Sequence, residues 1–180
     1  MIKQLLISIR ALVVLTIVTG VIYPLIVTGI GLVVFPRQAA GSFVEIGGKP
    51  AGSVLIAQKF TDPRYFWPRP SAADYGTVAS GASNQGFTSK KLLDAVRERR
   101  QVFGAAAPAD LLYASASGLD PHVSPEAAAF QIPRIAAARG MTPERVSAVV
   151  AQLTEPPQLA FLGQPRVNVL LLNLALDEIK

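Results

Sequence analysis

The most distinctive hydrophobic pattern in this chain is a run of 25 residues without a charge, from Ala11 to Phe35. An α-helix rises about 1.5 Å per residue, so the run would be about 37 Å long, against about 30 Å for the hydrocarbon core of a bilayer. The pattern therefore predicts a transmembrane helix over residues 11–35. A short segment, residues 1–10, precedes it, and a separate domain, residues 36–180, follows.

A cleaved signal peptide is the alternative interpretation, because Lys3 and Arg10 precede the apolar run. The apolar region of a signal peptide usually has about 7–15 residues and ends at a site with small residues. Here the run is longer, and Gln38 stands where the cleavage site needs a small residue. The sequence favours a retained, single-pass anchor.

The basic residues that flank the run predict its orientation. Lys3, Arg10 and the terminal amine precede it, and only Arg37 follows closely. Short basic flanks stay on the cytoplasmic side of a membrane. We therefore expect a cytoplasmic N-terminus and an extracytoplasmic domain, on a margin of about two charges.

Small or kinking residues recur at every fourth position within the run, at Thr16, Gly20, Pro24 and Thr28. Such residues let helix backbones approach closely in lipid, where no hydrophobic force drives helices together. A pure tether needs no stripe of this kind, so we expect this face to pack against partner helices. Two alternatives stay open: glycine and proline are generally commoner in membrane helices, and Pro24 can simply bend the span.

The pattern after the run predicts both strands and helices. The glycine-rich stretch 41–52 predicts a turn region, and the short apolar stretch 53–60 predicts a strand. Residues 111–114 predict a second short strand. The apolar C-terminal stretch 166–179 fits a strand, a helix, or a strand that passes into a helix.

Three predicted helices begin at residues that cap helix N-termini. Ser89 precedes apolar positions at helical spacing that continue to Phe103. Ser124 and Thr142 are each followed by proline and glutamate, which supplies a cap hydroxyl, a first-turn proline and a first-turn acid. The helix after Ser124 is expected to stop at Gly140. The part outside the membrane is thus predicted to be one compact α+β domain.

Composition narrows the possible functions. The first 36 residues hold two of the 17 basic residues, so the remainder carries 15 basic and 12 acidic residues, a net charge near +3. These charges are dispersed, and we expect no binding to nucleic acid. The chain has no cysteine, which excludes a disulfide framework, thiolate metal ligands and a cysteine nucleophile.

The single histidine, His122, lies beside Asp120 in a segment that also contains serines. One alternative function is therefore a membrane-anchored extracytoplasmic hydrolase that uses His122 and Asp120. Triad members this close in sequence rarely converge on one bond, and the chain has no G-x-S-x-G motif. One histidine with scattered carboxylates is also a weak metal-ligand set. We expect a structured turn at His122, no catalytic residue and no metal site.

Two other segments are candidates for binding. The loop over 80–86 is rich in glycine, serine and asparagine, like an anion-binding cradle, but lacks the lysine of a phosphate-binding P-loop. The aromatic residues Tyr65, Phe66 and Trp67 precede Arg69. They either pack the core or form a partner surface, since tyrosine, tryptophan and arginine are enriched at protein interfaces.

Several segments together resemble one family over nearly the whole chain, the C subunit of the Kdp-type potassium-transporting ATPase (the KdpC family). Besides the N-terminal span, the segments that carry the resemblance are Gly52–Phe60, Tyr65–Ala72, Ser80–Asn84, Ser115–His122, Gln131–Arg134 and Arg166–Leu170. They occur in the order found in the family. One departure is Ala82, where the family usually has a second glycine.

The resemblance implies a non-catalytic accessory subunit of an ATP-driven, high-affinity potassium uptake complex in the inner (plasma) membrane. The implied partners are a channel-like, potassium-binding subunit and a P-type ATPase subunit, with membrane lipid around the helix. The family is described as a catalytic chaperone that raises the ATP affinity of the pump subunit, and its Ser-Gly-x-Ser loop is compared to a nucleotide-binding signature. An extracytoplasmic domain meets almost no ATP, so the residues themselves argue against a firmly bound cofactor.

The resemblance and the residue patterns together define a set of candidate positions in the domain. We expect partner contacts, or the family loop, at Tyr65, Phe66, Trp67, Arg69, Ser80, Gly81, Ser83, Asn84, Asp120 and His122.

Overall fold

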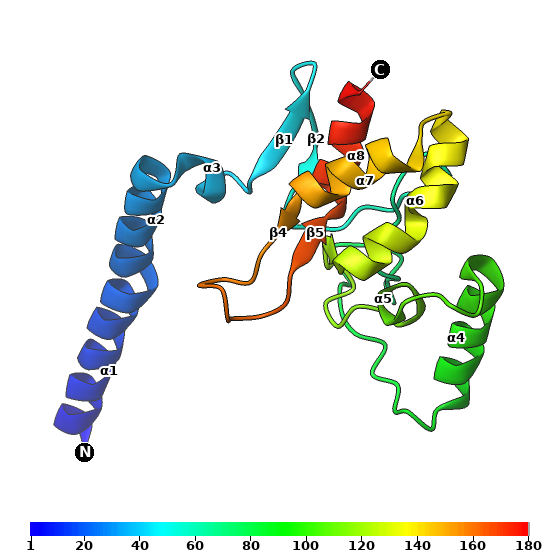
Figure 1. Ribbon diagram of the computed structural model, residues 1–180. Coiled ribbons are helices and arrows are strands. Elements are labelled where there is room, and N and C mark those ends of the chain that lie inside the picture. Colours follow the sequence, from blue (N-terminus) through cyan, green and yellow to red (C-terminus); the bar gives the residue numbers. More distant parts are fainter. Residues whose placement is uncertain (180) are drawn as a thin grey trace. The chain divides into compact units, whose positions relative to one another are not determined.

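The computed structural model describes residues 1–179 and divides the chain into two compact units, Met1–Ser53 and Val54–Lys180 (Figure 1). The first unit contains a long helix, a short helix and a β-hairpin. The second unit is built of helices and short strands, and the chain is α+β as the sequence predicts. The sequence places the start of the domain at residue 36, whereas the structure groups the hairpin with the long helix.

The first unit begins with one continuous helix of 33 residues, Ile2–Val34. It consists of α1 (Ile2–Ile17), a π-helical turn η1 (Val18–Ile22) and α2 (Tyr23–Val34). By length and composition it is a candidate membrane-spanning helix, and its apolar side chains are exposed in this structure. The helix begins nine residues before the uncharged run from which the span was predicted.

The π-helical turn ends at Ile22, two residues before Pro24. A proline inside a helix has no N–H to donate, and its ring crowds the carbonyl four residues earlier, here that of Gly20. A π turn, whose hydrogen bonds join residues five apart, locally widens the helix and gives the ring room. We attribute the turn to Pro24, and it lies within the stripe of small residues.

A short helix and a hairpin complete the first unit: α3 (Pro36–Ala39), β1 (Phe43–Ile46) and β2 (Lys49–Ser53), with the two strands antiparallel. Gly47 and Gly48 join the strands with φ of 58° and 76°. Two-residue hairpin turns need such positive values, which glycine adopts at little cost. The prediction of a turn region over 41–52 is therefore right for its centre and wrong for its flanks, which are strands.

The predicted strand over 53–60 is wrong, because β2 ends at Ser53. The backbone that follows finds partners outside any strand ladder. The Val54 carbonyl accepts a hydrogen bond from Asn168 Nδ2 at 2.8 Å, and the Ala57 N–H donates to the Leu119 carbonyl at 2.9 Å. An apolar stretch of this length matches the sequence pattern of a strand but does not form a strand here.

The helices of the second unit are α4 (Lys90–Phe103), α5 (Ala109–Leu112), α6 (Pro125–Arg139), α7 (Pro143–Gln152) and α8 (Val169–Glu178). The starts predicted at Ser89, Ser124 and Thr142 are confirmed. Ser124 Oγ accepts from the backbone N–H three residues on at 3.1 Å, and Thr142 Oγ1 does the same at 3.4 Å. Helix α6 ends at Gly140, which has a left-handed φ of 63°.

Short antiparallel strands form a three-stranded sheet in the order β3-β5-β4, namely β3 (His122–Val123), β5 (Arg166–Asn168) and β4 (Thr154–Glu155). The C-terminal stretch is a strand that passes into a helix, one of the three alternatives open from sequence. Asn168 ends the strand and caps α8, because its Oδ1 accepts from the Leu171 N–H at 3.2 Å.

The core lies between α6, α7, α8 and the sheet, and includes Phe66, Val123, Ile135, Val146, Val167, Leu172 and Leu176. A smaller cluster of Val96, Ala107 and Leu112 lies under α4. The strand predicted over 111–114 is wrong: α5 covers this region, and the Tyr113 N–H closes its turn on the Ala109 carbonyl at 2.9 Å. One helical turn buries Leu111 in the main core and Leu112 in the smaller cluster.

Candidate functional site

The aromatic segment 65–69 belongs to none of the described strands, and two amide side chains hold its backbone. Asn173 of α8 accepts from the Phe66 N–H at 2.7 Å and donates to the Phe66 carbonyl at 3.0 Å. Gln131 of α6 makes the same pair of bonds with Trp67, at 2.9 Å and 3.1 Å. Each amide thus replaces the neighbouring strand that would otherwise satisfy these backbone groups.

The three aromatic rings of this segment lie in different surroundings. Phe66 is fully buried, so it packs the core, one of the two roles expected for these rings. Trp67 is partly buried between the Arg134 guanidinium, 4.2 Å from the ring centroid, and Phe103, whose ring lies edge-on at 5.5 Å. Tyr65 is also partly buried. Only Tyr65 and Trp67 of the three retain an exposed edge.

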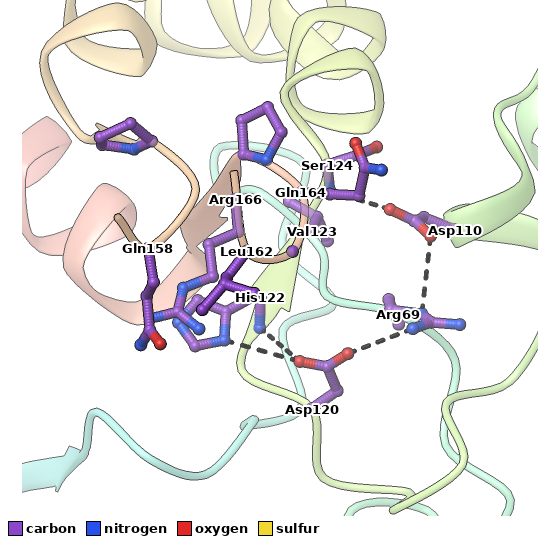
Figure 2. A pocket seen from close by; sticks show the side chains of 13 residues that line it. Arg69, Asp110, Asp120, His122, Val123, Ser124, Gln158, Leu162, Gln164 and Arg166 are labelled. Carbon is purple, nitrogen blue, oxygen red and sulfur yellow. Dashed lines mark hydrogen bonds and ion pairs between the residues drawn. The ribbon is translucent and has the colours of Figure 1, made fainter. Parts of the chain in front are cut away.

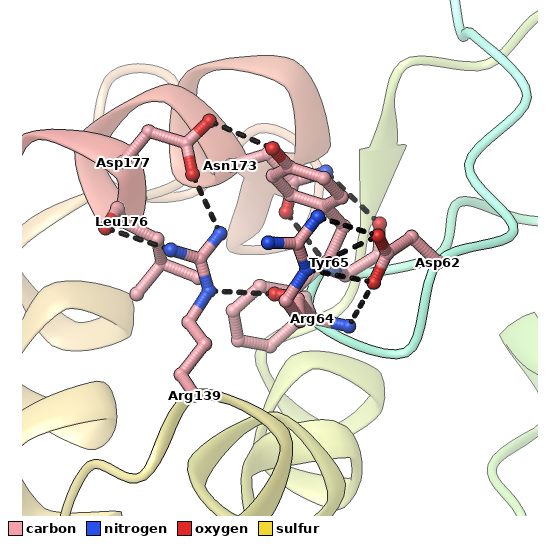
Figure 3. A network of polar contacts seen from close by, with 8 residues as sticks. Asp62, Arg64, Tyr65, Arg139, Asn173, Leu176 and Asp177 are labelled. Carbon is pink, nitrogen blue, oxygen red and sulfur yellow. Dashed lines mark hydrogen bonds and ion pairs between the residues drawn. The ribbon is translucent and has the colours of Figure 1, made fainter.

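A polar network joins this segment to the C-terminal helix (Figure 3). The Tyr65 hydroxyl donates to Asp177 Oδ2 at 3.0 Å, and Arg139 Nη2 donates to Asp177 Oδ1 at 2.7 Å. Arg139 Nε also donates to the Arg64 carbonyl at 2.7 Å. The hydrogen bond to Asp177, together with burial, raises the pKa of the Tyr65 phenol. Hydrogen bonds from Arg64 lower the pKa of the Asp62 carboxyl to about 2.

Arg69, at the other end of the segment, reaches the loop that carries Asp120 and His122 (Figure 2). Its Nη1 donates to Asp120 Oδ2 at 3.2 Å, and its Nε lies 3.8 Å from Asp110 Oδ1. Within the described part of the chain Nε is a buried donor without a hydrogen bond, so its contact with Asp110 is purely ionic. Asp110 Oδ2 accepts from the Ser124 N–H at 2.8 Å. These groups line a cleft of about 680 Å³.

Asp120 organises the turn that contains the single histidine. Its Oδ1 accepts from the His122 N–H at 3.0 Å and lies 3.7 Å from His122 Nδ1. Burial raises the pKa of the Asp120 carboxyl, but hydrogen bonds from His122 and Arg69 outweigh burial, and the resulting pKa is below its usual range. The nearby Ser117 and Ser124 hydroxyls accept hydrogen bonds from backbone N–H groups two and three residues on. These bonds match the structured turn that the sequence predicts.

The loop that contains Ser80, Gly81, Ser83 and Asn84 is mostly exposed. It approaches the Asp120 loop closely at one point. A Cβ built on Gly118 would lie 2.9 Å from the Gly81 carbonyl oxygen, and Gly118 has a φ of 70°. Both the space and the backbone conformation therefore require glycine at position 118.

The structure brings together three sequence-predicted segments that lie far apart in the chain. The Arg69–Asp120 ion pair joins the aromatic segment to the loop over 117–122, and the approach of Gly81 to Gly118 joins the loop over 80–84 to it. The predicted stripe lies in the first unit, where all four of its members are exposed: Thr16, Gly20, Pro24 and Thr28. A Cβ on Gly20 would lie 4.0 Å from Thr16 Cγ2, so these two residues are neighbours on the helix.

Sequence reasoning missed the residues that hold the aromatic segment in place. Asn173 interrupts the apolar run of α8 and is 1% exposed, and Gln131 of α6 is 2% exposed. Buried polar side chains nearly always have hydrogen-bond partners, so a lone amide in an apolar helix is the signal that could have identified them. The described residues include no group of three His, Cys, Asp or Glu side chains that could hold a metal ion.

One candidate membrane-spanning helix ahead of an α+β unit is the pattern typical of single-span, membrane-anchored proteins. Comparison with known families is more specific. The family model described as "KdpC: K+-transporting ATPase, c chain" matches residues 5–178. The chain belongs to this family and is an accessory subunit of a potassium pump, which assembles with the other subunits of that pump.

Relatives that align over at least nine-tenths of their own length support the assignment. The potassium-transporting ATPase KdpC subunit of Polaromonas naphthalenivorans (strain CJ2) is 54% identical over 177 residues, which cover 93% of this chain and 90% of the relative. The KdpC subunit of Geobacter sulfurreducens is 52% identical over 184 residues, 97% of both chains. That of Dechloromonas aromatica is 51% identical over 182 residues, 96% of this chain and 95% of the relative.

Proposed function

We propose that the second unit is an extracytoplasmic cap over the channel-like, potassium-conducting subunit, and that it stabilises the assembly of that subunit with the P-type ATPase subunit. The observation that carries the proposal is the convergence of the segments 65–69, 80–84 and 117–122 through the Arg69–Asp120 and Gly81–Gly118 contacts. Segments that lie almost entirely outside regular secondary structure are held together in one surface. A fixed surface binds a partner with a small entropy cost.

The same geometry supports a non-catalytic role. Asp120 faces His122, but the serine hydroxyls of this loop serve as turn and helix-cap acceptors, and Arg69 neutralises the carboxylate. Polar groups that hold a loop are poorly placed to attack a substrate. The alternative hydrolase predicts turnover by the isolated chain. We expect potassium-stimulated ATP hydrolysis from the assembled complex and none from this chain alone, and hydrolysis by the purified chain would refute the accessory role.

The proposed cap requires the second unit to lie outside the cytoplasm, with the helix as a single pass through the inner (plasma) membrane. The excess of basic residues before the helix supports this orientation. A reporter fused after the last residue is expected to behave as extracytoplasmic. Cytoplasmic reporter activity would overturn the cap.

Site-specific cross-linking tests which subunit the surface reaches. Cysteines introduced at Ser80 and Asn84, both exposed, are expected to cross-link to the channel-like subunit in intact membranes. Gln101 of α4 is exposed outside the three converging segments, so Gln101→Cys is the matched control and is expected to react less. If none of the loop cysteines reaches a partner in an active complex, the second unit is not a cap.

A contribution to nucleotide affinity is the second candidate function, and one observation favours it. Ser83 of the family loop lines a hollow of about 310 Å³ together with the basic residues Lys91 and Arg99. Basic side chains beside a serine suit a phosphate group. Lys91→Ala should then weaken ATP binding by the complex, and Lys90→Ala, which changes a lysine outside the hollow, should not. The extracytoplasmic reporter result that supports the cap would exclude this contact.

A further inference from the structure

The loop over 156–165, between β4 and β5, ends in exposed apolar side chains. Leu159, Phe161 and Leu162 are 76%, 75% and 50% exposed. We call residues 159–162 the apolar tip, and Figure 1 shows its loop projecting beyond the short sheet of the second unit. Grouped apolar side chains on an ordered surface mark sites of interaction more often than isolated ones do.

The apolar tip is held in one shape. The Leu162 N–H donates to the Gln158 carbonyl at 2.8 Å, and the Gln158 N–H donates to the Leu162 carbonyl at 3.0 Å. Between them Leu159 and Ala160 have φ of 52° and 67°, a left-handed conformation that residues with a Cβ rarely adopt. The bonded loop therefore presents its apolar side chains in advance of binding, which reduces the entropy cost of association.

Charged residues line the cleft that Leu162 borders, and they restrict what the tip can bind. Leu162 lines the cleft that also contains Arg69, Asp110 and Asp120. Arg166, on the same cleft, pairs with Glu155 at 2.9 Å. An apolar centre with a polar rim is the usual anatomy of a protein–protein interface.

A lipid surface is a poor match for this arrangement. Residues 156–165 contain no charge, and the rim described above has three carboxylates against two guanidinium groups. Anchors that lie on membranes depend on basic residues that attract anionic headgroups. The rim instead complements a surface with neutral or basic groups around an apolar hollow.

We propose that the apolar tip inserts into an apolar hollow, bordered by neutral or basic residues, on the extracytoplasmic face of the channel-like subunit. This inference rests on the proposed cap function and identifies the apolar tip as the segment that anchors the cap. Phe161 and Leu159 enter the hollow, and the cleft beside Leu162 receives the edge of the partner.

Photo-cross-linking from the tip identifies what it contacts. A photoreactive residue replaces Phe161 in the assembled complex in native membranes, and the matched control replaces Val102 of α4, an apolar residue that is 67% exposed outside the three converging segments. We expect position 161 to label the channel-like subunit and position 102 to label it at least several-fold less. Labelling of lipid alone, or only of the first unit of this same chain, overturns the proposal.

A double variant tests whether the tip contributes to assembly. Leu159→Ser with Phe161→Ser is compared with Leu93→Ser with Val102→Ser, two exposed apolar side chains of α4, outside the three converging segments. We expect the tip variant to lower recovery of the channel-like subunit with this chain by at least tenfold and the control to change it less than twofold. Unchanged thermal unfolding of the tip variant, followed through Trp67 fluorescence, shows that it folds. Equal recovery of both variants overturns the proposal.

The two sets of cross-links distinguish the anchor from the cap. If the cysteines at Ser80 and Asn84 reach the channel-like subunit but position 161 does not, the tip inference is wrong and the cap stands. If neither set reaches it, the cap fails as well.

Discussion

Replacing Asn173 with leucine tests whether a buried amide holds the aromatic segment in place. Asn173 is 1% exposed, and its two hydrogen bonds to Phe66, at 2.7 Å and 3.0 Å, satisfy both backbone groups of a fully buried residue. Leucine has the same branched arrangement of side-chain heavy atoms and is somewhat larger, so Asn173→Leu leaves no cavity. The variant therefore removes the hydrogen bonds with little other change to the core.

The magnitude follows from the two backbone groups that lose their partner. A buried donor or acceptor left unsatisfied costs about 1–3 kcal/mol. The added apolar volume of leucine offsets part of this cost, so we expect a net loss of about 3 kcal/mol in the free energy of unfolding. For a unit of this size, such a loss lowers Tm by roughly 10 °C.

Trp67 provides the assay, because it is the only tryptophan in the chain and lies next to Phe66. Its fluorescence in the full chain in detergent reports unfolding of the second unit alone. Gln101→Ala removes an exposed amide from α4 and is the control, with an expected change within about 0.5 kcal/mol. A loss below about 1 kcal/mol in Asn173→Leu would show that the segment does not depend on this amide.

Three further predictions follow from other contacts. Asp120 has a folded pKa below its unfolded value of about 4, so its ionised form stabilises the fold above that pH. This stabilisation disappears as pH falls through the folded pKa, so Asp120→Asn should flatten the loss of stability as pH falls below about 4, as measured by urea unfolding. Gly118→Ala places a Cβ 2.9 Å from a carbonyl oxygen at a positive φ and should cost about 2 kcal/mol, whereas Gly86→Ala, with nothing within 4 Å, should be nearly neutral in the same assay. Gly20→Leu should reduce co-purification of the other subunits, because the larger side chain blocks close approach of a partner helix. Gly29→Leu, the same change outside the stripe, should reduce co-purification less. Intact assembly with Gly20→Leu would show that the stripe faces lipid.

The elements that sequence reasoning predicted well are long and have clear ends. The uncharged run and the helices capped by Ser124 and Thr142 contain many residues that repeat one pattern, and each start has a local chemical cause. The strands of the second unit have two or three residues, as in β3 (His122–Val123). The alternation of apolar and polar residues that marks a strand cannot be recognised in so few positions. Their formation depends on distant partners: β3 pairs with residues 167 and 168.

The candidate site was predictable as separate segments but not as an arrangement. The segments of the family resemblance identified Arg69 and Asp120, which are 51 residues apart, yet nothing local indicates that they form an ion pair. The bonds between Asn173 and Phe66 cross 107 residues. Both contacts result from tertiary packing, which brings α8 beside the aromatic segment, and no spacing rule along the chain encodes such packing.

The way in which the converging segments are held has a consequence for an accessory subunit. Apart from His122, the first residue of β3, their backbones lie outside regular strands and helices, and side chains hold much of their shape: Asn173 and Gln131 hold the aromatic segment, and Arg69 joins it to Asp120. Each of these side chains is engaged within the chain, and in the proposed cap what remains for a partner is a surface of fixed form. A rigid surface that binds by shape complementarity requires few polar contacts with the partner. It does require a well-packed core beneath it. Substitutions in the buried faces of α6 and α8 should therefore weaken assembly of the pump as strongly as substitutions at the surface itself.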